Sequence, residues 1–315
     1  MDWKNRRIDA LLEQALIEDK AASDTTTNLT IDPELRATAT ILARQPMIVA
    51  GLGCIPVIFD IFARLDAKNT KRNSAPTRYE VVSHPEIFDG VRVRDGQSLA
   101  VVRHNARALL SCERVILNLM QRMSGIATLT RQYADALHGA KAHVLDTRKT
   151  VPGLRALDKY SVLCGGGTNH RLDLSDGILI KNNHIVLGGG VRQILTRALA
   201  GRKPGQRIQI EVRNAKELDE ALKYGAEAIL LDNMTPDQVK ASVARIKQQE
   251  AKHEDADPEV AGEKKFWIPV EASGGITLEN IRNYALAGAD FISVGALTHS
   301  AKAADISMRI TAESR

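Results

Sequence analysis

The chain has 315 residues, enough for two domains, and its aromatic content of 4% argues against a stacking platform for single-stranded nucleic acid. Its net charge of +5 is modest, and three cysteines without a CxxC pair argue against a disulfide framework. Because the chain has no apolar run of 18 residues and MDWKNRRID is no signal peptide, we expect a soluble cytoplasmic protein.

The first third of the chain shows no strict alternation of strands and helices. Apolar residues at helical spacing predict helices over residues 5–18 and 56–65. Short strand patterns with intervening turn signals (Gly90 and Asp95–Gly96) occur at 38–43, 78–83 and 98–103. This region predicts a mixed α+β domain with a small open sheet.

A long helical pattern begins near Asn105. Its apolar stripe consists of Leu109, Cys112, Ile116, Leu119 and Met123. We expect Ser124–Gly125 to break this helix and a second helix to run to about Leu137. The domain boundary is placed here, with an N-terminal α+β domain at 1–125 and a second domain at 126–315 whose last helix returns to the first domain.

From residue 143 the pattern becomes a repeated alternation of strands and helices. Apolar runs of strand length recur at 143–147, 178–182, 208–212, 228–232, 268–272 and 291–295. Helical patterns separate most of them, near 191–200, 215–224, 236–248 and 278–287, with Gly225 and Gly288 as C-terminal caps. Such repeats imply parallel strands, and six strands alone do not show a complete eight-stranded barrel.

Polar residues or glycines follow these strands at their C-terminal ends, where the working residues of parallel α/β barrels gather. They are Arg148, Lys149, Lys181, Glu211, Asp232, Ser273 and Gly295. His170 and Arg171 add further basic groups after the triple glycine 165–167. Guanidinium and ammonium groups bind carboxylates and phosphates strongly, so we expect one active-site mouth for a small, heavily anionic substrate.

Two glycine-containing strand ends predict a phosphate cradle. Gly274–Gly275 and Gly295–Ala296 have little or no side chain, so their backbone N–H groups can approach an oxyanion closely. Helices expected near Thr277 and Ser300 would add favourable N-termini. No second histidine at metal-ligand spacing accompanies His170, which disfavours a zinc site.

Several blocks of the chain resemble one known family. They are ERVILNLMQRMSGIAT (113–128), DTRKTVPGLR (146–155), GGGTNHR (165–171), LIKNNH (179–184), IEVRN (210–214), ILLDNM (229–234), EASGGI (271–276) and SVGALTHS (293–300). In this order they resemble the signatures of quinolinate phosphoribosyltransferase, also called nicotinate-nucleotide pyrophosphorylase (carboxylating). The resemblance implies an α+β open-sheet domain followed by an incomplete parallel α/β barrel. It also implies that quinolinate and phosphoribosyl pyrophosphate give nicotinate mononucleotide, pyrophosphate and CO2, a step of NAD biosynthesis.

The resemblance also implies roles for individual residues. The quinolinate carboxylates are expected to meet Arg114, Arg148, His170, Arg171 and Lys181, and Arg148 also faces the pyrophosphate with Lys149. Thr147 is a further residue expected to bind substrate. The phosphoribosyl pyrophosphate is expected to meet Lys149, Glu211, Asp232, Ser273, Gly274, Gly275, Gly295 and Ala296. The residues expected to act in catalysis are Lys149, Lys181, Glu211 and Asp232. Arg114 is expected to reach the site of a neighbouring subunit, which implies a homodimer with shared sites and leaves a higher oligomer open.

The acids Glu211 and Asp232 allow three interpretations. They can form an acid/base pair, hold ribose and a Mg²⁺ ion that pyrophosphate carries, or form structural ion pairs. We favour the second, because Mg²⁺ often uses one or two carboxylates together with substrate phosphates. No organic cofactor is expected.

Other functions remain open at this point. Lys181 at a strand end suits a Schiff-base aldolase, and the same pocket suits a non-catalytic sugar-phosphate-binding protein. A phosphoribosyltransferase of the Rossmann type is disfavoured, because its motif of two adjacent acids is absent. Cys164 beside the glycine run is interpreted as a small apolar residue in preference to a nucleophile.

The chain departs from the family pattern in two respects. Asn182 stands where the family usually shows Asp, and its effect is left open. Two polar stretches, near 66–78 and 247–265, look inserted, and the second is expected to be a solvated loop or a frayed extension of a helix, without a functional role.

Overall fold

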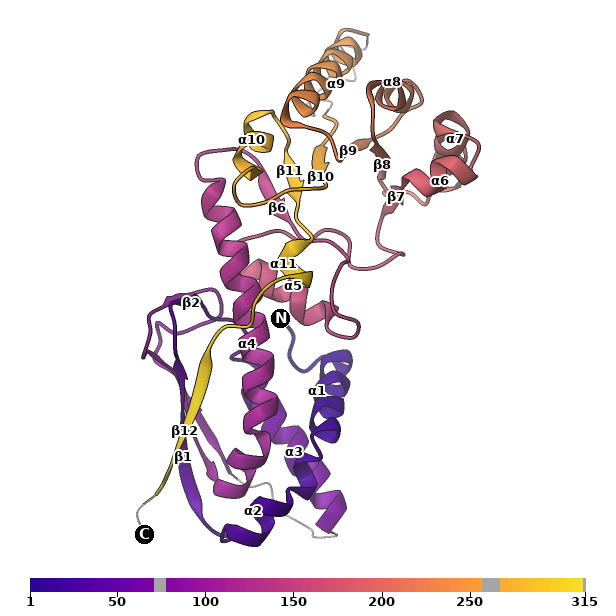
Figure 1. Ribbon diagram of the computed structural model, residues 1–315. Helices are drawn as coiled ribbons and strands as arrows, with labels where there is room; N and C mark the ends of the chain where they lie inside the picture. Colours follow the sequence, from indigo (N-terminus) through magenta and orange to yellow (C-terminus); the bar gives the residue numbers. More distant parts are fainter. Residues whose placement is uncertain (71–77, 257–266, 314–315) are drawn as a thin grey trace. The chain divides into compact units, whose positions relative to one another are not determined.

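The computed structural model describes residues 1–70, 78–256 and 267–313, and the chain forms two compact units (Figure 1). The first unit consists of residues 1–131, 150–166 and 297–315, and the second of residues 132–149 and 167–296. Residues 71–77 and 257–265 of the two polar stretches lie outside the described residues, and residues 247–256 form the end of a helix, in agreement with the expected helix extension.

The first unit contains an antiparallel sheet with the predicted strands and one unexpected strand. The order of the sheet is β12 (Ile306–Ala312), β1 (Arg36–Ala43), β5 (Ser98–Asn105) and β3 (Glu80–Val82). Alternate residues of β1 are buried, as expected for a sheet with one face on the core. The chain's final element is thus a strand paired with β1, and not the helix that we expected to return here.

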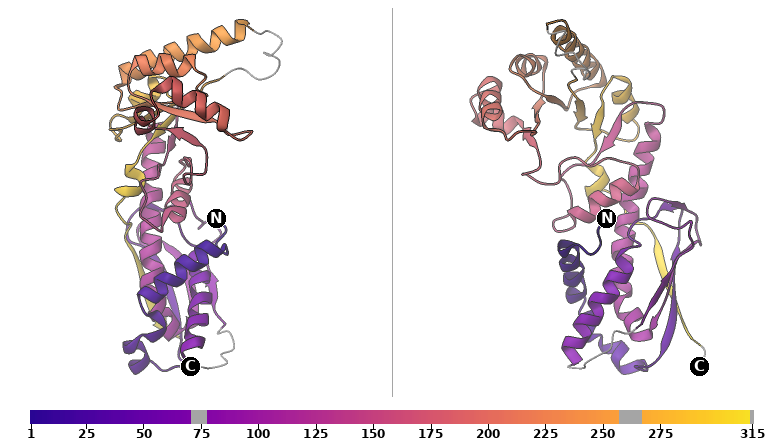
Figure 2. Two further views of the ribbon diagram at one scale, coloured as in Figure 1. Left: turned by 90° about the vertical axis from the view of Figure 1, so that its right-hand side faces the viewer. Right: turned by 180° about the vertical axis from the view of Figure 1, so that it is seen from behind.

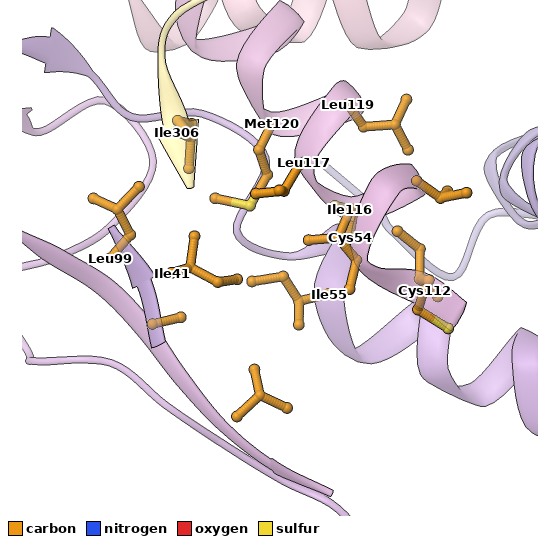
Figure 3. Close-up of a cluster of buried hydrophobic side chains, with 14 of the residues drawn as sticks. Ile41, Cys54, Ile55, Leu99, Cys112, Ile116, Leu117, Leu119, Met120 and Ile306 are labelled. Carbon is orange, nitrogen blue, oxygen red and sulfur yellow. The ribbon is translucent and has the colours of Figure 1, made fainter. Parts of the chain in front are cut away.

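The long α4 (Ala106–Ala136) and α3 (Cys54–Thr70) lie on one face of this sheet (Figure 1), and α1 (Arg6–Glu18) packs on α3. The unit also contains the helices α2 (Thr25–Thr30) and α5 (Arg155–Cys164). Short elements complete the unit, namely the 3-10 turn η1 (Ala21–Ser23), the strand pair β2 (Met47–Ile48) and β4 (Arg92–Val93), and α11 (Ala296–His299). Aliphatic side chains from the sheet, α3 and α4 meet in the core, together with Cys54 and Cys112 (Figure 3).

The predicted break in the long helix was wrong, because α4 continues through Ser124 and Gly125. A Cβ atom on Gly125 would lie 2.1 Å from the backbone oxygen of Lys302. The glycine therefore lets the segment before β12 pack directly on the helix, and it does not act as a breaker.

The second unit contains the six predicted strands in one parallel sheet. Their order is β6 (His143–Leu145), β11 (Phe291–Ser293), β10 (Val270–Ser273), β9 (Ala228–Asp232), β8 (Ile208–Val212) and β7 (Ile178–Ile180). No ladder joins β6 to β7 among the described residues, so the barrel stays open there, which confirms the incomplete barrel. In the gap, Thr168 forms one parallel bridge to Leu145.

Helices cover the outside of this sheet (Figures 1 and 2). They are α6 (Asn182–Leu187), α7 (Val191–Gly201), α8 (Ala215–Lys223), α9 (Pro236–Ala256) and α10 (Ile281–Leu286), and consecutive members pack on each other. Gly225 and Gly288 follow α8 and α10 with φ angles of +85° and +99°, which confirms them as helix-terminating glycines. Among the described residues, no helix is long and apolar enough to cross a membrane.

Candidate active site

The candidate active site lies in the second unit, where the C-terminal ends of the parallel strands meet at one edge. Ile180 pairs with Ile210 across β7 and β8, so Lys181 and Glu211, which follow them, are neighbours. Asp232 and Ser273 are register partners at the ends of β9 and β10. The strand ends therefore gather two acids, a lysine and a serine at one place.

Arg148 and Arg171 form a pair of like charges. Burial lowers the pKa of Arg171, and the positive charge of Arg148 lowers this pKa further, while Asp176 opposes both effects. The Nε atom of Arg148 is buried without a hydrogen-bond partner among the described residues. A buried donor without a partner costs about 1–3 kcal/mol, so this pair is set to accept an anion.

Glu211 and Asp232 form the opposite pole of the site. Burial raises the pKa of Glu211, and the negative charge of Asp232 raises it further. The backbone N–H of Asn182, 3.4 Å from Glu211 Oε1, and the charge of Lys181 act in the opposite direction. Two like charges in a half-buried place suit a divalent cation, which would relieve their repulsion. The described residues hold no group of three or more His, Cys, Asp or Glu arranged for a metal.

The two glycines of the turn after β10 differ in their surroundings. Gly274 and Gly275 have φ angles of +95° and +64°, and a Cβ on Gly274 would lie 2.2 Å from Asn233 Oδ1. Nothing lies within 4 Å of a Cβ built on Gly275, so the backbone is open there. The helix expected near Thr277 begins at Ile281 and has six residues. The helix expected to begin near Ser300 was wrong, because the four-residue α11 begins at Ala296 and ends at His299. The backbone of the turns therefore has to supply the N–H groups of any phosphate cradle.

A buried polar network joins His170 to a residue that the sequence did not single out. The Glu271 carboxylate, in β10, receives hydrogen bonds from Ser293 Oγ and from Gln209 Nε2 at 2.6 Å. His170 Nε2 lies 3.3 Å from the same carboxylate. A polar residue inside the otherwise apolar run IPVEAS was the signal that could have found Glu271.

The remaining predicted residues lie as follows. Thr147 Oγ1 accepts the backbone N–H of Lys149 at 3.1 Å, which shapes the turn after β6. Arg114 lies in the first unit on α4, with 69% of its side chain exposed and Glu113 at 4.0 Å. Cys164 is half-buried, and burial raises the pKa of its thiol to about 11, which disfavours a nucleophilic role.

Comparison with known proteins gives matches over nearly the whole chain. The family profile "Quinolinate phosphoribosyl transferase, C-terminal domain" matches residues 126–309, and the corresponding N-terminal domain profile matches residues 24–124. "Nicotinate-nucleotide pyrophosphorylase [carboxylating]" of Mycobacterium leprae is 39% identical over 298 residues, which cover 94% of this chain and 95% of that protein. "Probable nicotinate-nucleotide pyrophosphorylase [carboxylating]" of Bacillus subtilis is 37% identical over 97% of this chain and 94% of its own.

Solved structures give the same result. NadC from Streptococcus pyogenes superposes with a TM-score of 0.84 at 32% identity and with full coverage of both chains. Nicotinate-nucleotide pyrophosphorylase from Ehrlichia chaffeensis gives a TM-score of 0.79 at 34% identity, covering 96% of this chain and 98% of that one.

Proposed function

Because the chain belongs to the quinolinate phosphoribosyltransferase family, we propose that it transfers the phosphoribosyl group of phosphoribosyl pyrophosphate to quinolinate with decarboxylation. The products are nicotinate mononucleotide, pyrophosphate and CO2. The observation that carries this proposal within the site is the Arg148–Arg171 pair, whose buried donor calls for an anionic partner. Neither the Schiff-base aldolase nor the non-catalytic binding protein is favoured by any of the similar proteins named above.

The cationic pole binds the two adjacent carboxylates of quinolinate. Arg148 and Arg171 supply planar guanidinium forks, which match carboxylate geometry, and Lys181 adds a point charge. Thr147 and His170 complete this pocket, and Lys149 faces the pyrophosphate. The support is the like-charge pair, which an anion would neutralise.

The acidic pole binds the ribose. Glu211 and Asp232 accept hydrogen bonds from ribose hydroxyls and can also hold a Mg²⁺ ion that enters with the pyrophosphate. When bound, the ion supplies positive charge against the leaving pyrophosphate. Ser273, Gly274, Gly275, Gly295 and Ala296 hold the 5′-phosphate, and the support is the open backbone at Gly275.

The chemistry needs position and charge and no protein nucleophile. The bond between the anomeric carbon and pyrophosphate breaks through an oxocarbenium-like state, and the pyridine nitrogen then bonds to that carbon. The cations around the carboxylates stabilise the ground state and oppose loss of CO2. Decarboxylation becomes easy once the ring nitrogen is cationic and stabilises the electron pair left on the adjacent carbon, which then takes up a proton. N-glycosylation therefore precedes decarboxylation.

The working unit is a homodimer in which Arg114 completes the neighbouring subunit's carboxylate pocket. The support is the exposed position of Arg114 on α4 within a sequence block that resembles the family's. A cytoplasmic location is supported by the three cysteines, all of which are free thiols.

The test is a direct assay. Purified protein is mixed with Mg²⁺, phosphoribosyl pyrophosphate and quinolinate, and nicotinate mononucleotide and CO2 are measured together. Equal amounts of both products are expected, and omission of either substrate should abolish both. Binding of quinolinate without either product would contradict the proposed reaction.

A further inference from the structure

Glu271 is a buried carboxylate that the reaction does not use directly. It is the second residue of β10 and is 3% exposed. Three donors from separate segments point to it: Ser293 of β11, Gln209 of β8 and His170 of the loop before β7. Burial acts to raise the pKa of Glu271, but the hydrogen bond from His170, the charge interaction with His170 and the hydrogen bonds from Ser293 and Gln209 outweigh burial and hold this pKa below its ordinary value. The carboxylate is therefore ionised at neutral pH.

The contacts of His170 define its tautomer. Its Nδ1 accepts the backbone N–H of Arg171 at 2.7 Å. A ring nitrogen that accepts a hydrogen bond carries no proton, so the proton of the neutral ring lies on Nε2 and is donated to Glu271. The backbone N–H of His170 in turn donates to Oδ1 of Asp146, 2.8 Å away, which is fully buried. Two buried carboxylates thus hold the residue that directly precedes Arg171.

Packing alone does not fix the segment that contains His170 and Arg171. A cavity of about 500 Å³ borders His170, Arg171, Gln209 and Glu271. A side chain next to such a space can change rotamer unless hydrogen bonds fix it. The direction of the His170 ring therefore depends on its contacts with Glu271 and with the Arg171 backbone.

We propose that Glu271 is a positioning residue, which fixes the His170 ring and through it the Arg171 guanidinium that binds a carboxylate of the substrate. This inference rests on the proposed function for the identity of the substrate.

The test is Glu271→Gln, which keeps the volume and removes the charge. A charge-assisted hydrogen bond is about twice as strong as a neutral one, so a less well-fixed Arg171 should weaken quinolinate binding about tenfold, or about 1.4 kcal/mol. The KM for quinolinate should rise by this factor, while kcat and the KM for phosphoribosyl pyrophosphate stay within about twofold. The matched control is Gln209→Met, which removes another donor from Glu271 but leaves the His170 contact. It should lower thermal stability and leave the KM for quinolinate unchanged.

A second measurement needs neither substrate nor variant. Histidine labelled with ¹⁵N in the wild-type protein reports the tautomer of each ring, and His170 should show a protonated Nε2 and an unprotonated Nδ1. The opposite tautomer would overturn the proposal, as would equal effects of Glu271→Gln and Gln209→Met on the KM for quinolinate. An unchanged KM in folded Glu271→Gln would also overturn it. If the wild-type protein makes no product, the proposed function fails, while the tautomer still tests the positioning role.

Discussion

Replacing Arg148 with methionine should have two effects of opposite sign. Methionine has a similar length but neither a charge nor a donor. The substitution removes the buried Nε–H that has no partner among the described residues, and it removes the positive charge that lowers the pKa of Arg171. The ligand-free protein should therefore become more stable while its affinity for quinolinate falls.

The magnitudes follow from the contacts. Removing a buried unpaired donor returns part of a cost of about 1–3 kcal/mol, so the free energy of unfolding should rise by about 1 kcal/mol. A guanidinium that binds a carboxylate through two charge-assisted bonds contributes about 3 kcal/mol or more, so the quinolinate Kd should rise on the order of 100-fold.

The assay is urea unfolding of the ligand-free protein together with calorimetric titration of quinolinate alone. The matched control is Arg245→Met. Arg245 forms two hydrogen bonds of 2.9 and 2.7 Å to Asp219, and these two side chains are 47% and 56% exposed. Exposed pairs contribute about 1 kcal/mol or less, so this control should change stability slightly and leave the Kd unchanged. If Arg148→Met lowered the unfolding free energy by about 2 kcal/mol and kept the Kd, Arg148 would be a structural residue and our reasoning would be refuted.

Three further predictions concern other parts of the chain. Gly125→Ala should destabilise the protein by about 1–2 kcal/mol in urea unfolding, because the steric overlap with the Lys302 backbone exceeds the helix-propensity gain of about 1 kcal/mol. The control Gly201→Ala places nothing within 4 Å of the new Cβ and should be neutral or stabilising. Burial lowers the pKa of His104 from 6.5 to about 4, and the charge of Arg36 contributes to this shift. Between these two pH values only the unfolded chain takes up the proton. The free energy of unfolding should therefore fall by up to about 3 kcal/mol as the pH drops from about 6.5 to 4. His104→Asn should flatten this pH dependence, and a slope equal to that of the wild type would contradict the assignment. Borohydride with carbonyl substrates should leave Lys181 unmodified by mass spectrometry, and a trapped adduct would favour the aldolase.

The strands of the second unit could be predicted because parallel strands covered on both faces appear as uninterrupted apolar runs. Helix α5 was missed, since its buried face includes Asp158 and Lys159, whose charges hide the helical period. Asp158 is buried because Arg122 binds both of its oxygens, at 2.8 and 2.7 Å. This compensation joins residues 36 positions apart, and a local pattern cannot show it.

The same limit applies to Gly125 and Glu271. A glycine in a helix looks like a breaker in sequence, and only the Lys302 backbone against it explains why it is there. A glutamate in a strand looks like an irregularity until its donors from β8, β11 and the loop before β7 are known. The candidate site residues could be proposed from the sequence alone, because strand ends and glycines mark such positions locally; their roles stay predictions.

The charged residues of the candidate site differ from the buried Glu271 in how well their charges are compensated. Arg148 lies beside Arg171, and Glu211 lies beside Asp232, so each pole of the site holds like charges that disfavour each other in the free protein. Glu271 is the opposite case, a buried charge with three donors. On the proposed assignments, unfavourable charge occurs where a substrate group can relieve it, and satisfied charge occurs where a side chain has to stay fixed. It follows that quinolinate should stabilise the protein through the Arg148–Arg171 pair, and phosphoribosyl pyrophosphate with Mg²⁺ through the Glu211–Asp232 pair. Neutralising one member of a pair should weaken the stabilisation by the ligand of that pair and leave the other ligand's effect in place.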